Sequence, residues 1–243
     1  MKIVKQIPNL LTSLNLTCGF IAIILAFQPN MHQFAPYLIF IAAVFDFSDG
    51  FAARMLKAYS ELGKQLDSMA DMVSFGVAPG IIAYQMIQVA YAPFIHTSTI
   101  VWALSYIVPA LIPVFSALRL AKFNIDERQT TSFIGLPTPA SAILIVSLAL
   151  VLFNTSNIVL LGIITNPLII TSIIVADCFL MITELPMFSL KMKSLSFKEN
   201  STQYIFLLIS IALIALFQLH ALPLIIGLFI IESIVIRILK TKK

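Results

Sequence analysis

Residues 46–71 read DFSDGFAARMLKAYSELGKQLDSMAD, and this stretch places acidic side chains in two otherwise apolar segments. The acids are Asp46, Asp49, Asp67 and Asp71. A charged residue at the centre of a membrane-spanning helix costs about 2.5–3.5 kcal/mol on insertion scales, so four cost on the order of 10 kcal/mol before compensation. A divalent cation is the simplest partner that offsets this cost, because clustered carboxylates are good ligands for such ions.

The spacing of the stretch places its acidic and small residues on one face of each helix. On the first segment, the positions i, i+3, i+4 and i+7 are held by Asp46, Asp49, Gly50 and Ala53. On the second, the positions i, i+4 and i+8 are held by Gly63, Asp67 and Asp71. If the two helices pack antiparallel, the carboxylates point into one cleft, with Arg54 near its mouth. The small residues would let a ligand lie directly against the backbone.

The chemistry of the cluster predicts a divalent-metal site. Four carboxylates supply hard oxygen ligands, which suit Mg²⁺, Mn²⁺ or Ca²⁺ and do not suit zinc or copper. We expect the four aspartates to share the metal, with Asp46, Asp49 and Asp67 as the main ligands. A structural polar cluster sealed by Arg54 and Lys64 is the alternative, but four acids against two bases leave excess negative charge.

The composition requires a membrane. Sixty per cent of the 243 residues are hydrophobic and 11% are charged, whereas a soluble domain is nearer half apolar and a quarter charged. We therefore expect an all-α integral membrane protein, a polytopic bundle of about eight spans. The apolar stretches are Leu10–Phe27, Ala35–Leu56, Leu66–Val89, Ser98–Ala121, Pro139–Phe153, Ile158–Ile182, Tyr204–Leu219 and Leu222–Leu239. The turn between the fifth and sixth falls at residues 154–157 or at 165–167, since both carry turn residues.

The charges predict the orientation. All fifteen Lys and Arg residues lie at the termini or in the connections that follow even-numbered spans, including the Arg54–Lys64 turn and the Arg119–Arg128 loop. By the positive-inside rule that side, with both termini, is cytoplasmic. The net charge of +4 therefore serves topology and attraction to anionic headgroups, and no nucleic-acid partner is expected. The aspartates lie near the cytoplasmic ends of the second and third helices.

The string D-x2-D-G-x2-A-R-x8-G-x3-D-x3-D resembles the signature of the CDP-alcohol phosphatidyltransferases, and every position is matched. Two further stretches resemble the branch of that family that makes phosphatidylserine. They are IPNLLTSLNLTCGF (Ile7–Phe20) and RLAKFN (Arg119–Asn124) followed by FIGLPTPA (Phe133–Ala140). The resemblance runs from about Ile7 to Lys193.

The resemblance implies an enzyme that moves a phosphatidyl group from CDP-diacylglycerol to an acceptor hydroxyl and releases CMP. It implies a six-helix catalytic core over residues 1–193, followed by a two-helix extension over residues 194–243. It also implies a homodimer, surrounded by membrane lipids, in the bacterial cytoplasmic (inner) membrane with the active site facing the cytoplasm. L-serine is the favoured acceptor. Glycerol 3-phosphate, inositol phosphate or another alcohol stays open, because Arg119, Lys122 and Arg128 could supply cations for a second phosphate.

Phosphoryl chemistry suggests roles for the signature residues. Attack at the β-phosphorus places charge on the pyrophosphate and the departing CMP, which two ions of Mg²⁺ or Mn²⁺ would stabilise; Ca²⁺ fits the same ligands. By resemblance, Asp71 is the base for the acceptor hydroxyl. The CDP-lipid is expected to contact Asp49, Gly50, Ala53, Arg54 and Gly63. A direct displacement is expected, because no Ser, Cys or His nucleophile with a suitable partner is visible.

Polar residues outside the signature have two interpretations each. Arg119 is either a ligand for phosphate or for the serine carboxylate, or a snorkelling cation. Asp177 either pairs with Arg119 or binds an acceptor's amino group. Thr138, like these two residues, is a candidate contact for the acceptor or for a phosphate. On the first helix, i+3 spacing is shared by Asn9, Thr12 and Asn15. These three either hydrogen-bond to neighbouring helices or line the nucleotide site.

An ion-coupled transporter is the competing class, because intramembrane carboxylates often mark ion pathways. A transporter would be expected to show inverted repeats or broken helices in matching halves. Here the acids gather in one stretch of 26 residues, with no counterpart in the second half. The enzyme interpretation is therefore preferred.

Overall fold

The computed structural model describes residues 6–94, 96–126, 134–188 and 200–241. Within these residues the chain is helical, apart from turns and one isolated β-bridge between Ile134 and Pro186. The expected all-α class is confirmed. Of the residues named above, Arg128 and Phe133 lie outside the described residues, as do the basic residues between 189 and 199.

The helices follow the apolar segments closely. The first half comprises α1 (Ile7–Phe27), α2 (Ala35–Met55), α3 (Glu61–Asp71), α4 (Ala78–Tyr91) and α5 (Thr99–Ile125). The second half comprises α6 (Thr138–Asn154), α7 (Ile158–Ile164), α8 (Pro167–Ile182), α9 (Ser201–Phe217) and α10 (Ala221–Thr241). A π-helical turn, Met72–Val77, joins α3 to α4, so that the chain is helical without interruption over 31 residues.

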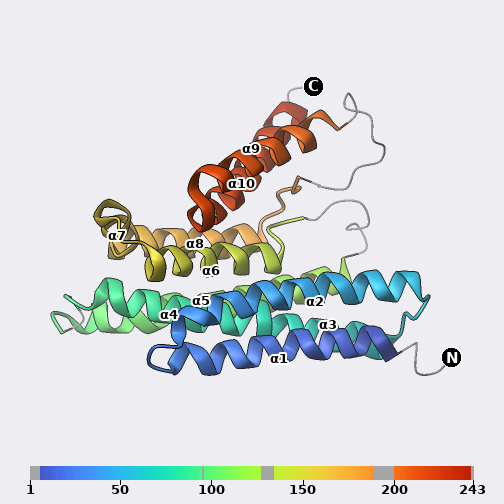
Figure 1. The fold of residues 1–243 in the computed structure, drawn as a ribbon, viewed down its shortest axis with the longest axis horizontal. Helices are drawn as coiled ribbons and strands as arrows, with labels where there is room; N and C mark the ends of the chain where they lie inside the picture. Colours follow the sequence, from blue (N-terminus) through green and yellow to red (C-terminus); the bar gives the residue numbers. More distant parts are fainter. Residues whose placement is uncertain (1–5, 95, 127–133, 189–199, 242–243) are drawn as a thin grey trace.

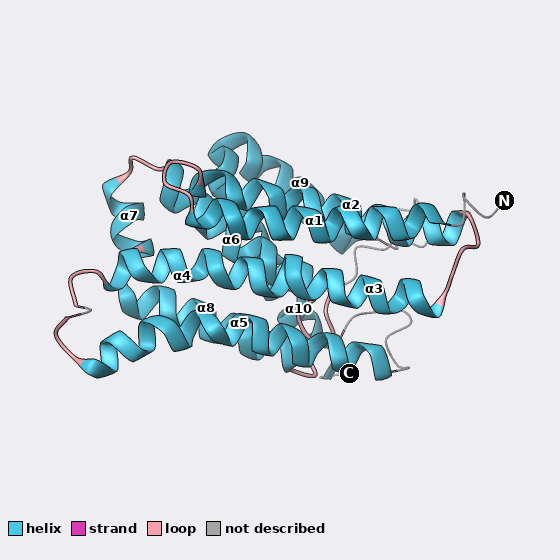
Figure 2. Ribbon diagram, turned by 90° about the horizontal axis from the view of Figure 1, so that it is seen from below, coloured by secondary structure: helices cyan, strands magenta, loops and turns pink. Residues whose placement is uncertain are grey.

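The long α3–α4 rod organises the bundle. Figure 2 shows it with α1 along one side and α5 along the other. Helix α1 packs against α2 and α3, while α6 lies against α2, α4 and α8. Helices α9 and α10 lie side by side as an inclined pair, and α10 meets the rest of the molecule at α6 (Figure 1). The first three helices therefore enclose the signature residues.

The helices are long and apolar enough for a polytopic membrane protein. Among the described residues, five continuous helical runs qualify as membrane spans by length and composition. One of these runs contains both α9 and α10, although a turn at Gln218–His220 separates them. The α7–α8 pair qualifies only as a span bent by 58°, and α6 has 17 residues. All eight predicted segments are thus helical, while eight separate crossings stay a prediction.

Two predicted helix boundaries were wrong, the start of the third helix and the end of the fourth. The third helix begins at Glu61 instead of Leu66, because Ser60 caps it by accepting a hydrogen bond from the Gly63 amide at 3.0 Å. Helix α5 continues to Ile125, past the predicted end at Ala121.

Both candidate turns after the fifth span are present in the structure. Helix α6 ends at Asn154, and α7 ends before a second break at Thr165 and Asn166. The Asn157 and Asn166 side chains cap the helices that follow, each accepting two backbone N–H groups. Each break therefore has its own local cause.

Helix α1 approaches the π-helical turn very closely at Gly19. A Cβ atom on Gly19 would lie 2.7 Å from the Cα atom of Ser74, which is backbone that cannot swing away. No such clash exists at Gly227 on α10, where nothing lies within 4 Å. The contact therefore requires glycine for its size.

We predict that Gly19→Ala lowers the free energy of unfolding by about 1–3 kcal/mol, the usual cost of overpacking. The matched Gly227→Ala is expected to be neutral or slightly stabilising, because alanine favours the helix. Thermal unfolding of the purified protein in detergent measures both. An unchanged midpoint for Gly19→Ala would show that α1 and the π-helical turn are less tightly packed than described.

Candidate active site

Three signature carboxylates converge between α2 and α3. Asp46 and Asp49 project from α2 and Asp67 from α3, and one ligand oxygen from each lies within 4.8 Å of the others. Asp49 is 6% exposed. The Oδ1 atom of Asp67 is buried and has no hydrogen-bond partner among the described residues. Three converging carboxylates, one of them with a buried oxygen that lacks a partner among the described residues, fit Mg²⁺ or Mn²⁺, which both bind oxygen ligands.

Asp71 lies one helical turn beyond Asp67, where α3 gives way to the π-helical turn. Its side chain is buried and interacts directly with that of Asp46, although it is not one of the three most closely gathered carboxylates. The Nδ2 atom of Asn15 on α1 donates to its Oδ1 atom at 3.1 Å. π-Helical turns occur frequently at functional sites, and this one directly follows a candidate catalytic acid.

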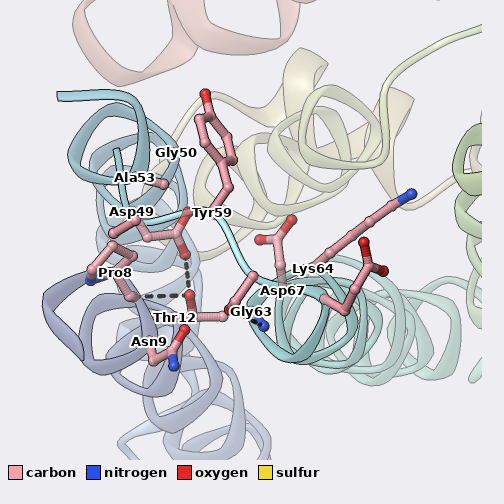
Figure 3. A pocket seen from close by; sticks show the side chains of 13 residues that line it. Pro8, Asn9, Thr12, Asp49, Gly50, Ala53, Tyr59, Gly63, Lys64 and Asp67 are labelled. Atoms are coloured by element: carbon pink, nitrogen blue, oxygen red, sulfur yellow. Dashed lines mark hydrogen bonds between the residues drawn. The ribbon is translucent and has the colours of Figure 1, made fainter. Parts of the chain in front are cut away.

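Two side chains of helix α1 donate hydrogen bonds to two of the four aspartates, Asp49 and Asp71. The Thr12 hydroxyl donates to Asp49 Oδ2 at 2.6 Å, and it also lies 3.0 Å from the carbonyl oxygen of Pro8 (Figure 3). A single hydroxyl proton favours the shorter, charge-assisted bond to the carboxylate. Thr12 and Asn15 therefore bond across to neighbouring helices, which was one of their two interpretations.

A pocket of about 550 Å³ opens beside the carboxylates, between the ends of α1, α2 and α3. Among its walls are the signature residues Asp49, Gly50, Ala53, Gly63 and Asp67 (Figure 3). Gly50 has no heavy atom within 4 Å of where its Cβ would lie, so that any side chain there would occupy the pocket itself. The small residues of the signature thus keep this space open.

The rest of the pocket wall comes from residues that sequence reasoning assigned less directly. Beyond the signature, the lining residues are Pro8, Asn9, Thr12, Ala58, Tyr59, Ser60, Glu61 and Lys64. Asn9 and Thr12 were candidates through their spacing. The other residues, from Ala58 to Lys64, belong to the Arg54–Lys64 turn, for which only a role in membrane orientation was predicted. The presence of Gly63 in this turn was the one sequence feature that pointed to the pocket.

Arg54, expected near the mouth of the cleft, is not among the residues that line the pocket. It lies exposed in the last turn of α2. The chain turns directly after it, with Lys57 at a positive φ of 49°. The signature therefore places Arg54 next to the pocket in sequence, while its side chain is at the protein surface.

The candidate acceptor residues are buried in α5, α6 and α8. Arg119 is 5% exposed, interacts electrostatically with Asp71 and lies over the ring of Phe123 at 4.8 Å. Asp177 is 1% exposed and accepts a hydrogen bond from Ser141 at 2.5 Å. Within the described part of the chain, Asp177 Oδ1 and Thr138 Oγ1 are buried without hydrogen-bond partners.

The fold and the site together define a polytopic membrane enzyme with an intramembrane carboxylate centre. The profile of the CDP-alcohol phosphatidyltransferase family matches residues 5–193. The chain belongs to this family.

Several similar proteins carry a more specific name. The chain is 40% identical over 159 residues to the CDP-diacylglycerol–serine O-phosphatidyltransferase of Bacillus subtilis, covering 65% of this chain and 81% of that protein. It is 32% identical over 232 residues to the enzyme of the same name from Helicobacter pylori, covering 94% and 89%. Archaetidylserine synthase of Methanothermobacter thermautotrophicus is 34% identical over 143 residues, covering 58% and 56%.

Thr12→Val is predicted to weaken Mn²⁺ binding by about 10–100-fold, because Asp49 loses the hydrogen bond that orients it. Titration of the protein with Mn²⁺, followed by electron paramagnetic resonance, measures this without turnover. Thr17→Val is the control: Thr17 is exposed on the same helix and its hydroxyl bonds to the carbonyl oxygen of Ser13 at 2.8 Å. Equal affinities for the two variants would exclude a role of Thr12 in the metal site.

Proposed function

We propose that this protein transfers a phosphatidyl group from CDP-diacylglycerol to the hydroxyl of L-serine, giving phosphatidylserine and CMP. The observation that carries the proposal is the convergence of Asp46, Asp49 and Asp67 beside a pocket lined by the small signature residues. The serine acceptor is supported by the names of the relatives from Bacillus subtilis and Helicobacter pylori.

The pocket is the proposed site of the nucleotide end of the CDP-lipid. Gly50, Ala53 and Gly63 leave room for the cytidine and ribose to lie against the backbone. Asp49 lies at the boundary between the pocket and the carboxylate cluster. Arg54, exposed at the end of α2, is proposed to reach the pyrophosphate from the surface.

The four aspartates are the proposed metal ligands, with Asp46, Asp49 and Asp67 as the main ones. Bound Mg²⁺ or Mn²⁺, in our proposal two ions, would neutralise the charge that develops on the pyrophosphate. Ca²⁺ suits the same oxygens. The buried Oδ1 atom of Asp67, which lacks a hydrogen-bond partner in the described structure, supports this assignment.

The reaction is proposed to be one direct displacement. Asp71 takes the proton of the serine hydroxyl, and the hydroxyl oxygen forms a bond to the β-phosphorus. The bond between that phosphorus and the bridging oxygen breaks, and CMP leaves with the electron pair. Asp71 suits this role because it is buried next to Asp46 and because Asn15 holds one of its oxygens.

The acceptor is proposed to bind on the side of the site formed by α5, α6 and α8. Arg119 interacts with Asp71 and would receive the serine carboxylate. Asp177 Oδ1 and Thr138 Oγ1, buried and without hydrogen-bond partners among the described residues, would accept from the amino group. Ser141 joins them, because it lies one turn from Thr138 on α6 and donates to Asp177.

The proposal includes the oligomeric state of the protein, its membrane and the division of its chain. The enzyme would work as a homodimer in the bacterial cytoplasmic membrane, with its site open to the cytoplasm and the acyl chains in lipid. Residues 1–193 would form the catalytic unit, and residues 194–243 an extension. Within the described residues, the extension contacts the rest of the chain where α10 packs on α6, and the Phe188 amide donates to Ser233 on α10 at 3.0 Å.

We predict that purified protein with CDP-diacylglycerol and Mn²⁺ or Mg²⁺ releases CMP when L-serine is added. Excess EDTA is expected to abolish the release, because the carboxylates then lack their counter-ions. Parallel reactions with glycerol 3-phosphate and inositol phosphate test the alternative acceptors. Turnover of one of these, with none for serine, would reject the serine assignment and keep the family chemistry.

Asp71→Asn is predicted to lower kcat by about 10²–10⁴-fold, the usual contribution of a general base. Glu232→Gln is the control, because Glu232 is a half-buried carboxylate on α10, outside the proposed site. The rate of CMP release at saturating substrates measures both variants. Near-normal turnover of Asp71→Asn would mean that another group accepts the proton.

A further inference from the structure

Asn15 lies outside the signature, yet it contacts the residue proposed as the base. It is fully buried on α1 (0% exposed), and its Nδ2 atom donates to Asp71 Oδ1 at 3.1 Å. The Asn15 NH₂ group thus faces Asp71, an orientation that suits a carboxylate acting as a base, because an ionised carboxylate only accepts hydrogen bonds.

The backbone of Asn15 is held in place by the π-helical turn that follows Asp71. The Ser74 hydroxyl donates to the carbonyl oxygen of Asn15 at 2.9 Å. One turn further along α1, Gly19 lies so close to Ser74 that a Cβ atom would not fit. Ser74 is three residues from Asp71. The segment that carries the Asp71 carboxylate therefore also holds the backbone of Asn15, whose side chain donates to that carboxylate.

The side-chain oxygen of Asn15, Oδ1, is buried and has no hydrogen-bond donor among the described residues. A buried acceptor without a partner costs about 1–3 kcal/mol. A leucine of similar shape would avoid this cost if the position served packing alone. Among the described residues, the asparagine is therefore best explained by the hydrogen bond that its side chain donates to Asp71.

We propose that Asn15 is the positioning residue of Asp71: it fixes one carboxylate oxygen, and so directs the other toward the acceptor hydroxyl. The inference rests on the proposed function. It assigns different tasks to two residues one turn apart on α1. Thr12 orients Asp49 on the side of the pocket, and Asn15 orients Asp71 on the side of the acceptor.

The test compares Asn15→Leu with Thr12→Val, using Thr17→Val as the control on the same helix. For each full-length protein we would measure kcat, the KM for CDP-diacylglycerol, and Mn²⁺ affinity by electron paramagnetic resonance. Asn15→Leu is expected to lower kcat by about 10–100-fold. At saturating Mn²⁺ its KM should stay within about threefold of the wild type, because the lost interaction affects the chemical step. Its Mn²⁺ affinity should fall less than that of Thr12→Val, because Asp71 is not one of the three main proposed ligands. Thr12→Val should show the opposite pattern, with weakened Mn²⁺ binding.

Asn15→Asp provides a second variant in case the leucine protein does not fold. It keeps the shape of the side chain but, when ionised, cannot donate to Asp71, so kcat should fall as it does for leucine. Normal kcat for either folded variant would overturn the proposal, as would a fall in kcat matched by an equal loss of Mn²⁺ affinity. If the wild type uses another alcohol, the same comparison applies with that acceptor. If the wild type releases no CMP with any acceptor, the proposed function fails and the inference fails with it.

Discussion

The structure depends on one constraint: four carboxylates lie inside an apolar helix bundle, Asp49 and Asp71 buried and Asp46 and Asp67 half-buried. Ionised side chains in such surroundings need partners, and three features of the bundle provide for them. Three acids converge closely enough to share a cation. Polar groups on α1 orient Asp49 and Asp71. The small residues beside them leave a pocket through which a charged ligand can approach.

Much of this arrangement could be predicted from the sequence, because it depends on spacing and hydrophobicity alone. Apolar length located eight segments that are all helical, since a bilayer demands about 20 apolar residues per span. The i, i+3 and i+4 spacing of Asp46, Asp49 and Asp67 predicted one face on each helix, and the structure brings their oxygens together. The pocket beside Gly50 and Gly63 follows from the same small residues.

Other features depend on local contacts that no pattern encodes. The start of α3 is set by the hydroxyl of Ser60, which moves the helix boundary ahead of the apolar run. Arg54 fits the signature, yet the turn after α2 leaves its side chain at the surface. For Thr12 and Asn15, spacing left two interpretations open. Only the packing of α1 against α2 and α3 shows which carboxylate each side chain meets.

The π-helical turn between Asp71 and Ala78 ties the geometry around Asp71 to chain length. In such a turn each N–H group bonds to the carbonyl five residues back, so that the turn accommodates about one residue more than an α-helical turn. Deletion of one residue within Met72–Val77 would therefore let the rod close into a regular α-helix, with α4 still facing the apolar core. The deletion would instead remove the wide turn that places Ser74 against Asn15 and Gly19.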